Sequence, residues 1–198
     1  MAESYEVLDE TADTAEVDEG KVSASEKMNR LRAGVLGAND GIVSVAAVVI
    51  GMVGGSASPR ATAMAGLAAL VGGAVSMALG EFVSVSSQRD AEMEAIRRNE
   101  LDASPRDLVS PVGAAISSFF SFLTGGIIPM LAVTLPPIGW RLVISFGATI
   151  FALAATGFIS AHIGDSKAGR ATIRMVVGGT LGLALTFLVG MLFGQVVA

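Results

Sequence analysis

The hydrophobic positions of this chain gather in five long apolar stretches, at about 33–57, 61–87, 112–135, 138–162 and 172–197. Each stretch is close to or longer than the roughly 20 residues that an α-helix needs to cross a bilayer. Turn-forming segments separate them, such as Pro136-Pro137 between the third and the fourth. The pattern predicts an all-α membrane protein with five transmembrane helices.

Two polar segments lie outside these stretches. Residues 1–26 hold nine of the 18 acidic residues and a single base, and they lack an apolar period. This composition predicts a disordered acidic tail rather than a signal peptide, followed by one membrane domain over 27–198. The charged link 88–110 is too short for a separate domain. It is either a solvated helical extension of the second helix or an entrance that gathers cations.

The distribution of basic residues predicts the orientation in the membrane. Lys and Arg residues close to spanning helices are retained on the cytoplasmic side. Eleven of the 13 precede the first span or lie in the second-to-third and fourth-to-fifth links, and only Arg60 and Arg141 lie on the other side. We therefore expect a cytoplasmic N-terminus and, with five spans, a C-terminus outside.

The composition agrees with a membrane protein whose helices pack closely. Hydrophobic residues make up 52% of the chain and charged residues 16%, with 24 glycines. Glycines four residues apart let neighbouring helices approach each other, which predicts tight packing or dimerisation. Three pairs with this spacing that we expect at helix contacts are Gly37 and Gly41, Gly178 and Gly182, and Gly190 and Gly194.

Asp40 and Glu81 are the acids that lie well inside the apolar stretches. An ionisable group there costs about 2.5–3.5 kcal/mol on insertion scales, so it needs a partner or a function. Asp40 follows Arg32 by eight residues, and Glu81 precedes Arg89 by eight. In antiparallel helices this spacing places both acids about 12 Å from the cytoplasmic boundary, where they would meet around one cation.

Met77 precedes Glu81 by four residues and therefore shares its helix face. Two carboxylates and a thioether, without thiolate or imidazole, suit Fe²⁺ or Mn²⁺ better than Zn²⁺ or Cu⁺. Repulsion between the acids would raise at least one pKa, so binding of the metal would expel a proton. The expected metal ligands are Asp40, Met77 and Glu81, and the candidate entrance residues are Glu92, Met93, Glu94 and Glu100.

Each of these residues has a second interpretation. Asn39-Asp40-Gly41 is also a helix-capping sequence, in which the first helix would begin at Gly41. Glu81 would then pair with Arg89 or lie at a thinned interface, and Met77 would fill a packing gap. In that case the chain is a membrane assembly or scaffold protein.

An enzyme is not expected. The chain has no cysteine and one histidine, which excludes disulfides, thiolate sites and the common zinc and Ser-His arrangements. Neither a cofactor nor a nucleic-acid partner is predicted.

Four segments resemble the vacuolar iron transporter (VIT) family. They are LRAGVLGANDGIVSVAAVVIG, GGAVSMALGEFVSVSSQRD, GGIIPML, and the glycine-rich helix after SKAGRATIR. Together they cover nearly all of residues 30–198. The cytoplasmic metal-binding domain that many members carry between helices two and three is absent, as in the nodulin-like branch, so its ligands cannot be transferred.

The resemblance implies a homodimer that moves Fe²⁺ and Mn²⁺ out of the cytoplasm in exchange for protons, between subunits, along helices one and two. Asp40 falls on the family's pore aspartate, Met77 on its pore methionine, and Glu81 on the acid of its Gly-Glu pair. A bacterial cytoplasmic membrane is the expected location, or an organelle membrane in a eukaryote.

Overall fold

The computed structural model of the chain describes residues 24–101, 108–163 and 168–197, which form five long α-helices and a short 3-10 turn. All five α-helices are long and apolar enough to cross a membrane, which confirms the predicted all-α fold. The predicted acidic tail, apart from residues 24–26, lies outside the described residues. In chain order the elements are α1 (Ala24–Gly54), α2 (Pro59–Arg97), α3 (Pro111–Thr134), η1 (Ile138–Trp140), α4 (Arg141–Ile163) and α5 (Ala168–Val197).

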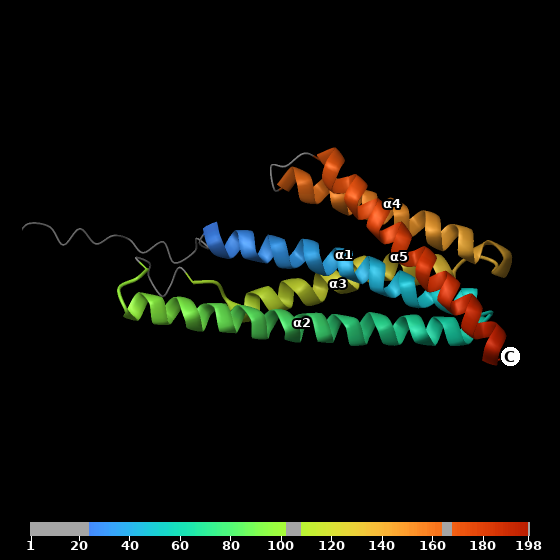
Figure 1. Cartoon of the computed structure of the whole chain (residues 1–198), viewed down its shortest axis with the longest axis horizontal. Helices are drawn as coiled ribbons and strands as arrows, with labels where there is room; N and C mark the ends of the chain where they lie inside the picture. Colours follow the sequence, from blue (N-terminus) through green and yellow to red (C-terminus); the bar gives the residue numbers. More distant parts are fainter. Residues whose placement is uncertain (1–23, 102–107, 164–167, 198) are drawn as a thin grey trace, which may run out of the picture.

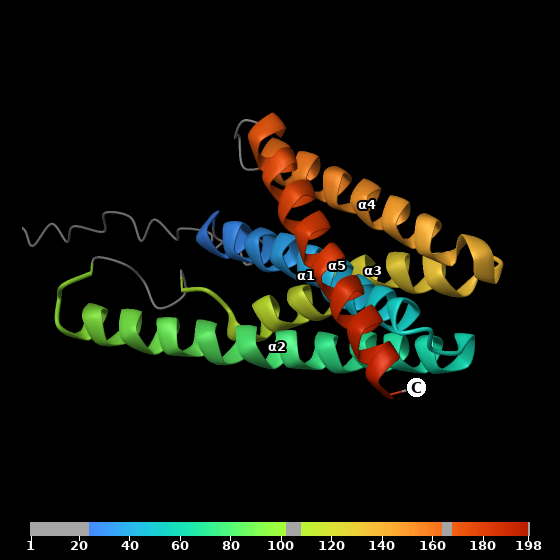
Figure 2. The ribbon, with the colours of Figure 1, turned by 45° about the vertical axis from the view of Figure 1, so that its right-hand side comes forward.

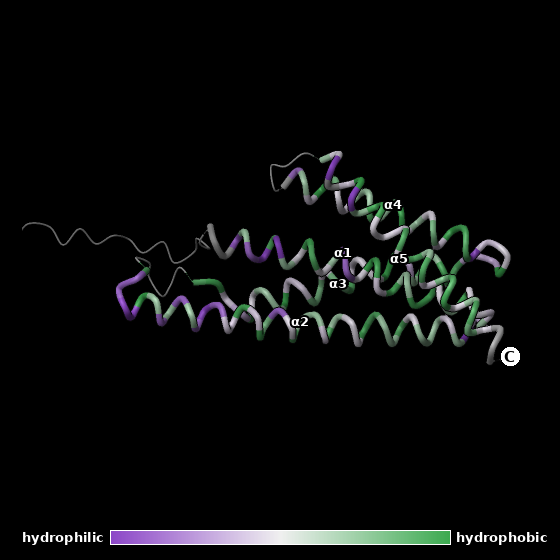
Figure 3. Tube along the Cα trace, viewed as in Figure 1, coloured by the Kyte–Doolittle hydropathy of each residue, from purple (hydrophilic) through white to green (hydrophobic). Residues whose placement is uncertain are grey.

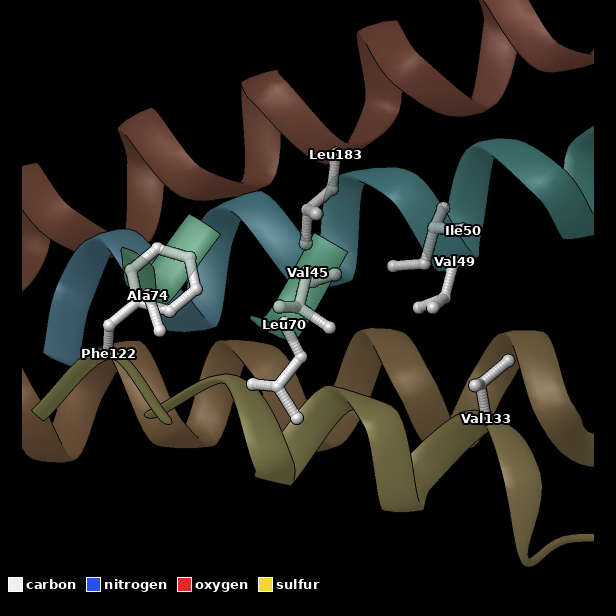
Figure 4. Packing of buried hydrophobic residues seen from close by; sticks show 9 residues of the cluster. Val45, Val49, Ile50, Leu70, Ala74, Phe122, Val133 and Leu183 are labelled. Carbon is white, nitrogen blue, oxygen red and sulfur yellow. The ribbon is translucent and has the colours of Figure 1, made fainter. Parts of the chain in front are cut away.

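Helix α1 lies at the centre of the molecule and contacts the four other α-helices. Helices α2 and α3 lie on one side of it and α4 on the other, while α5 crosses it obliquely (Figures 1 and 2). Four of its buried residues, Val45, Ala46, Val49 and Ile50, form a hydrophobic cluster with residues of three neighbouring helices. Figure 4 shows this cluster, which contains Val45, Val49, Ile50, Leu70, Ala74, Phe122, Val133 and Leu183.

Two of the three predicted glycine pairs lie at helix contacts. Gly37 and Gly41 face α3, and a Cβ at Gly41 would overlap the backbone carbonyl of Phe122. Gly190 and Gly194 of α5 lie equally close to the backbone at the end of α1. Since only hydrogen occupies these positions, the helix backbones can approach this closely.

The helices alternate in direction, so α1 begins and α2 ends at the same end of the molecule (Figure 1). Polar residues gather at this end (Figure 3). We call it the basic end, because Arg30 and Arg32 of α1 and Arg89, Arg97 and Arg98 near the end of α2 lie there. Its cytoplasmic location stays a prediction.

Helix α2 is 39 residues long and continues well past the apolar stretch that ends near residue 87. The helix begins at a Ser58 cap, whose side chain accepts a hydrogen bond from the Ala61 amide, with Pro59 at the first helical position. It ends at Arg97, and Asn99 adopts a left-handed conformation just beyond it. Residues 88–97 therefore form the expected helical extension of α2, while a cation-gathering role for them stays a prediction.

Helices α2 and α5 keep long exposed faces. Within the most apolar 18-residue segment of each helix, only 17% of α2 and 11% of α5 is buried. On α2 a line of small residues, Gly72, Ser76 and Gly80, is open, and nothing lies within 4 Å of a Cβ built at either glycine. The third predicted pair, Gly178 and Gly182 of α5, is also without a neighbour in the described chain.

Candidate metal site

A hollow of about 360 Å³ lies between α1 and α2 and brings the three predicted ligands together. Because liquid water occupies about 30 Å³ per molecule, this volume has room for an ion with part of its hydration shell. Phe122 of α3 also lines the hollow. The lining residues are Leu36, Asp40, Ser44, Gly73, Ser76, Met77, Gly80, Glu81 and Phe122.

Asp40 lies in the middle of α1, sixteen residues after its start at Ala24, and is half-buried. The alternative in which it caps a helix beginning at Gly41 is therefore wrong. The hydroxyl of Ser44, one turn later, donates a hydrogen bond of 3.0 Å to Asp40 Oδ1. A carboxylate has about four lone-pair positions, so this single hydrogen bond leaves lone pairs of Asp40 that can coordinate a cation.

Glu81 is buried, with 7% of its side chain exposed, and it forms an ion pair with Arg32 of α1. The distance from Arg32 Nη2 to Glu81 Oε1 is 2.8 Å. The alternative pairing with Arg89 is wrong, because Arg89 instead donates to the backbone carbonyls of Leu108 and Val109. The sequence showed that Glu81 needs a partner, but not that the partner belongs to another helix.

Met77 lies one helical turn from Glu81, is half-buried, and packs against the central hydrophobic cluster while it lines the hollow. Gly73 lies one turn before Met77 on the same face of α2, where a Cβ would overlap the ring of Phe122. The methionine therefore has a packing role and also faces the two acids. These two interpretations are compatible.

The backbone positions of Asp40 and Glu81 are staggered along α1 and α2 rather than level. A Cβ at Gly66 would lie 2.7 Å from Val49 Cγ1, and fifteen residues later Glu81 meets Arg32. This register places the Cα atom of Asp40 about six to eight residues farther from the basic end than that of Glu81, roughly 10 Å at 1.5 Å per residue. Both side chains tilt toward their helix N-termini and so toward each other. The predicted equal depth is corrected: Glu81 lies toward the basic end, and Asp40 lies deeper.

The candidate entrance residues are not brought together as a ligand set. Glu94 accepts hydrogen bonds of 2.7–2.8 Å from Arg97 and Arg98, which hold its pKa below the ordinary value in this charged extension of α2. Glu92 accepts from Gln88 at 2.9 Å, while Met93 and Glu100 are exposed. Across the described ranges no three acidic, histidine or cysteine side chains form a metal-binding group.

The sequence of this fold matches one known family over most of its length. A profile of the VIT family matches residues 31–107 and 93–191, which include both helices that line the hollow. The chain belongs to the VIT family. Like other members of the VIT family, it is therefore an integral membrane protein, and its five apolar helices agree with this.

Several plant proteins are similar along nearly the whole chain. The vacuolar iron transporter homolog 1 of Oryza sativa subsp. japonica is 41% identical over 185 residues, covering 90% of this chain and 80% of the relative. The vacuolar iron transporter homolog 2 of Arabidopsis thaliana is 36% identical over 185 residues, covering 91% and 94%. These two relatives thus match about nine tenths of the chain.

Proposed function

We propose that this VIT family member carries a divalent metal ion, Fe²⁺ or Mn²⁺, across the membrane through the hollow between α1 and α2. The observation that carries the proposal is the meeting of Asp40, Met77 and Glu81 in one hollow within the apolar helices. The names of the plant relatives, which describe iron transporter homologs, support the same cargo.

The stagger of the acids supports a route in two steps. Glu81, nearer the basic end, would receive the ion first, and Asp40 with Met77 would bind it deeper in the membrane. The positive-inside rule makes the basic end cytoplasmic, so the proposed direction is export from the cytoplasm. Protons returning to the vacated carboxylates would balance the charge, which amounts to metal–proton exchange.

A homodimer would complete this route. One chain supplies only two carboxylates to the hollow, and the hollow adjoins the exposed face of α2. The polar groups of the hollow would be costly if they faced lipid. A second chain packed on Gly72, Ser76 and Gly80 would cover these polar groups. Two copies of the site would then face each other and double the number of carboxylate ligands.

The direct test is metal flux in proteoliposomes. We expect Fe²⁺ and Mn²⁺ flux in the wild type and its loss in Asp40→Asn and Glu81→Gln. Asp90→Asn, which removes the same charge from an exposed position of α2, is the matched control and should transport normally. Unchanged flux in both site variants would remove the proposal and favour a scaffold role.

Proton exchange has its own test. Mn²⁺ flux is measured with and without an imposed pH gradient at zero membrane potential. Exchange requires faster flux when protons run down their gradient against the metal. Identical rates would reject proton coupling while leaving metal transport intact.

A further inference from the structure

Arg32 brings a positive charge into contact with the candidate site. Its Nη2 lies 2.8 Å from Glu81 Oε1 and 3.2 Å from Asn29 Oδ1. The two partners differ in exposure, since 55% of the Arg32 side chain is exposed but only 7% of Glu81. The carboxylate that lies nearest the basic end is therefore already neutralised by a cation belonging to the protein.

The guanidinium has a place to move to when it leaves Glu81. A second hollow of about 390 Å³ adjoins the first, and Leu36 lines both. Arg32 lines only the second hollow, yet its tip reaches Glu81 in the first. Because arginine has a long flexible side chain, it can swing into this space without any shift of α1. The other residues of the second hollow are Met28, Leu31, Val35, Asn39, Ser160 and Met175.

The burial of Glu81 makes it responsive to any cation. A buried carboxylate that loses its partner bears an uncompensated charge, which is strongly unfavourable. The pair itself is weakened because Arg32 is half in solvent, where ion pairs are screened. A divalent ion offers Glu81 twice the charge of the guanidinium, whereas Na⁺ or K⁺ offers no more than Arg32 already provides.

From these contacts we propose that Arg32 is a tethered competitor for Glu81, which is displaced by a divalent ion and excludes monovalent ions. The inference rests on the proposed function, because it assumes that Glu81 receives the metal. Arg32 thus acts as a specificity-determining residue at the first position of the route. It lowers the apparent affinity for every cation by the same factor, so a divalent ion, which binds a carboxylate more strongly, still displaces it, whereas Na⁺ or K⁺ does not.

The test is Mn²⁺ binding to the purified full chain in nanodiscs, measured from the electron paramagnetic resonance signal of free Mn²⁺. Arg32→Gln should bind Mn²⁺ about fivefold tighter, the factor that corresponds to losing a competing ion pair of this exposure. In about 100 mM K⁺, Mn²⁺ binding to Arg32→Gln should weaken, whereas Mn²⁺ binding to the wild type should not. Arg32→Lys keeps the charge and should stay close to the wild type.

Arg170→Gln removes the same charge from an exposed position at the same end of the molecule and serves as the matched control. Equal or weaker Mn²⁺ binding in Arg32→Gln, with unchanged thermal unfolding, would overturn the inference and leave Arg32 as a support for Glu81. If Glu81→Gln loses Mn²⁺ binding but Arg32→Gln does not bind more tightly, the metal site at Glu81 is supported and only the competition by Arg32 is rejected. A wild type that binds no Mn²⁺ overturns both.

A second measurement needs no variant to fold. In the wild type, Mn²⁺ should release the Arg32 guanidinium and raise its modification by phenylglyoxal, quantified by mass spectrometry, while exposed Arg170 stays constant. Unchanged or lower modification of Arg32 at saturating Mn²⁺ contradicts displacement.

Discussion

At the scale of single residues, the sequence was enough to select the residues of the candidate site but not to predict how they are arranged. Asp40, Met77 and Glu81 stand out because charged and polar groups are costly in apolar helices, and the structure places all three around one hollow. The partner of Glu81 could not be predicted. Arg32 lies 49 positions away in the chain, and only the packing of α1 against α2 brings it to the carboxylate.

Met77 allows a test of the thioether that leaves packing nearly intact. Met77→Leu conserves volume and should keep the thermal stability of the protein. We expect Fe²⁺ flux at low metal concentration to fall about tenfold, as for the loss of a group that supports a metal site. Met64→Leu is the control, because Met64 lies on the same helix and is exposed. Equal flux in the two variants would assign Met77 to packing alone.

At the scale of helices, the sequence predicts the number of elements well and their ends poorly. The apolar stretch of α2 stops near residue 87, yet the helix runs to Arg97, because a charged helix continues freely in water. This extension explains the misjudged depth of Glu81. The sequence predicts that Arg89 lies level with Arg32, whereas in the structure α2 reaches that level at Glu81, which contacts Arg32.

The contact between α1 and α3 makes a stability prediction at this scale. Gly41→Ala would drive a methyl group into the Phe122 carbonyl, and overpacking of this kind costs about 1–3 kcal/mol. We expect a lower unfolding temperature and, because Asp40 is the adjacent residue, weaker metal binding. Gly182→Ala is the matched control, since nothing lies within 4 Å of its Cβ position. Similar unfolding temperatures for both variants would show that the two helices separate easily.

At the scale of the whole molecule, the arrangement leaves α2 on one side with few neighbours (Figure 2). The sequence indicated association only through glycine spacing, and that signal does not tell contacts within a chain from contacts between chains. The structure separates them: the pairs at 37/41 and 190/194 are used internally, whereas Gly72 and Gly80 remain open.

The absence of cysteine makes the proposed dimer simple to test. Ser76→Cys should form an intermolecular disulfide on mild oxidation in membranes, because a contact along this line would bring paired Cα atoms within about 7 Å. Gly72→Cys and Gly80→Cys extend the test by one turn in each direction. Phe151→Cys, exposed on α4, is the control and should stay monomeric on denaturing gels. Crosslinking of the control alone would place the interface elsewhere.

The stagger of Asp40 and Glu81 has a consequence for how many ions the route can hold. Two divalent ions roughly 10 Å apart repel by about 7 kcal/mol at an effective dielectric constant of 20. Simultaneous occupancy is therefore strongly disfavoured within one chain. In the proposed route, an ion that reaches Asp40 would leave Glu81 vacant, and Arg32 would return to it behind the departing ion. The two acids would then act as successive steps of a relay that carries one ion at a time.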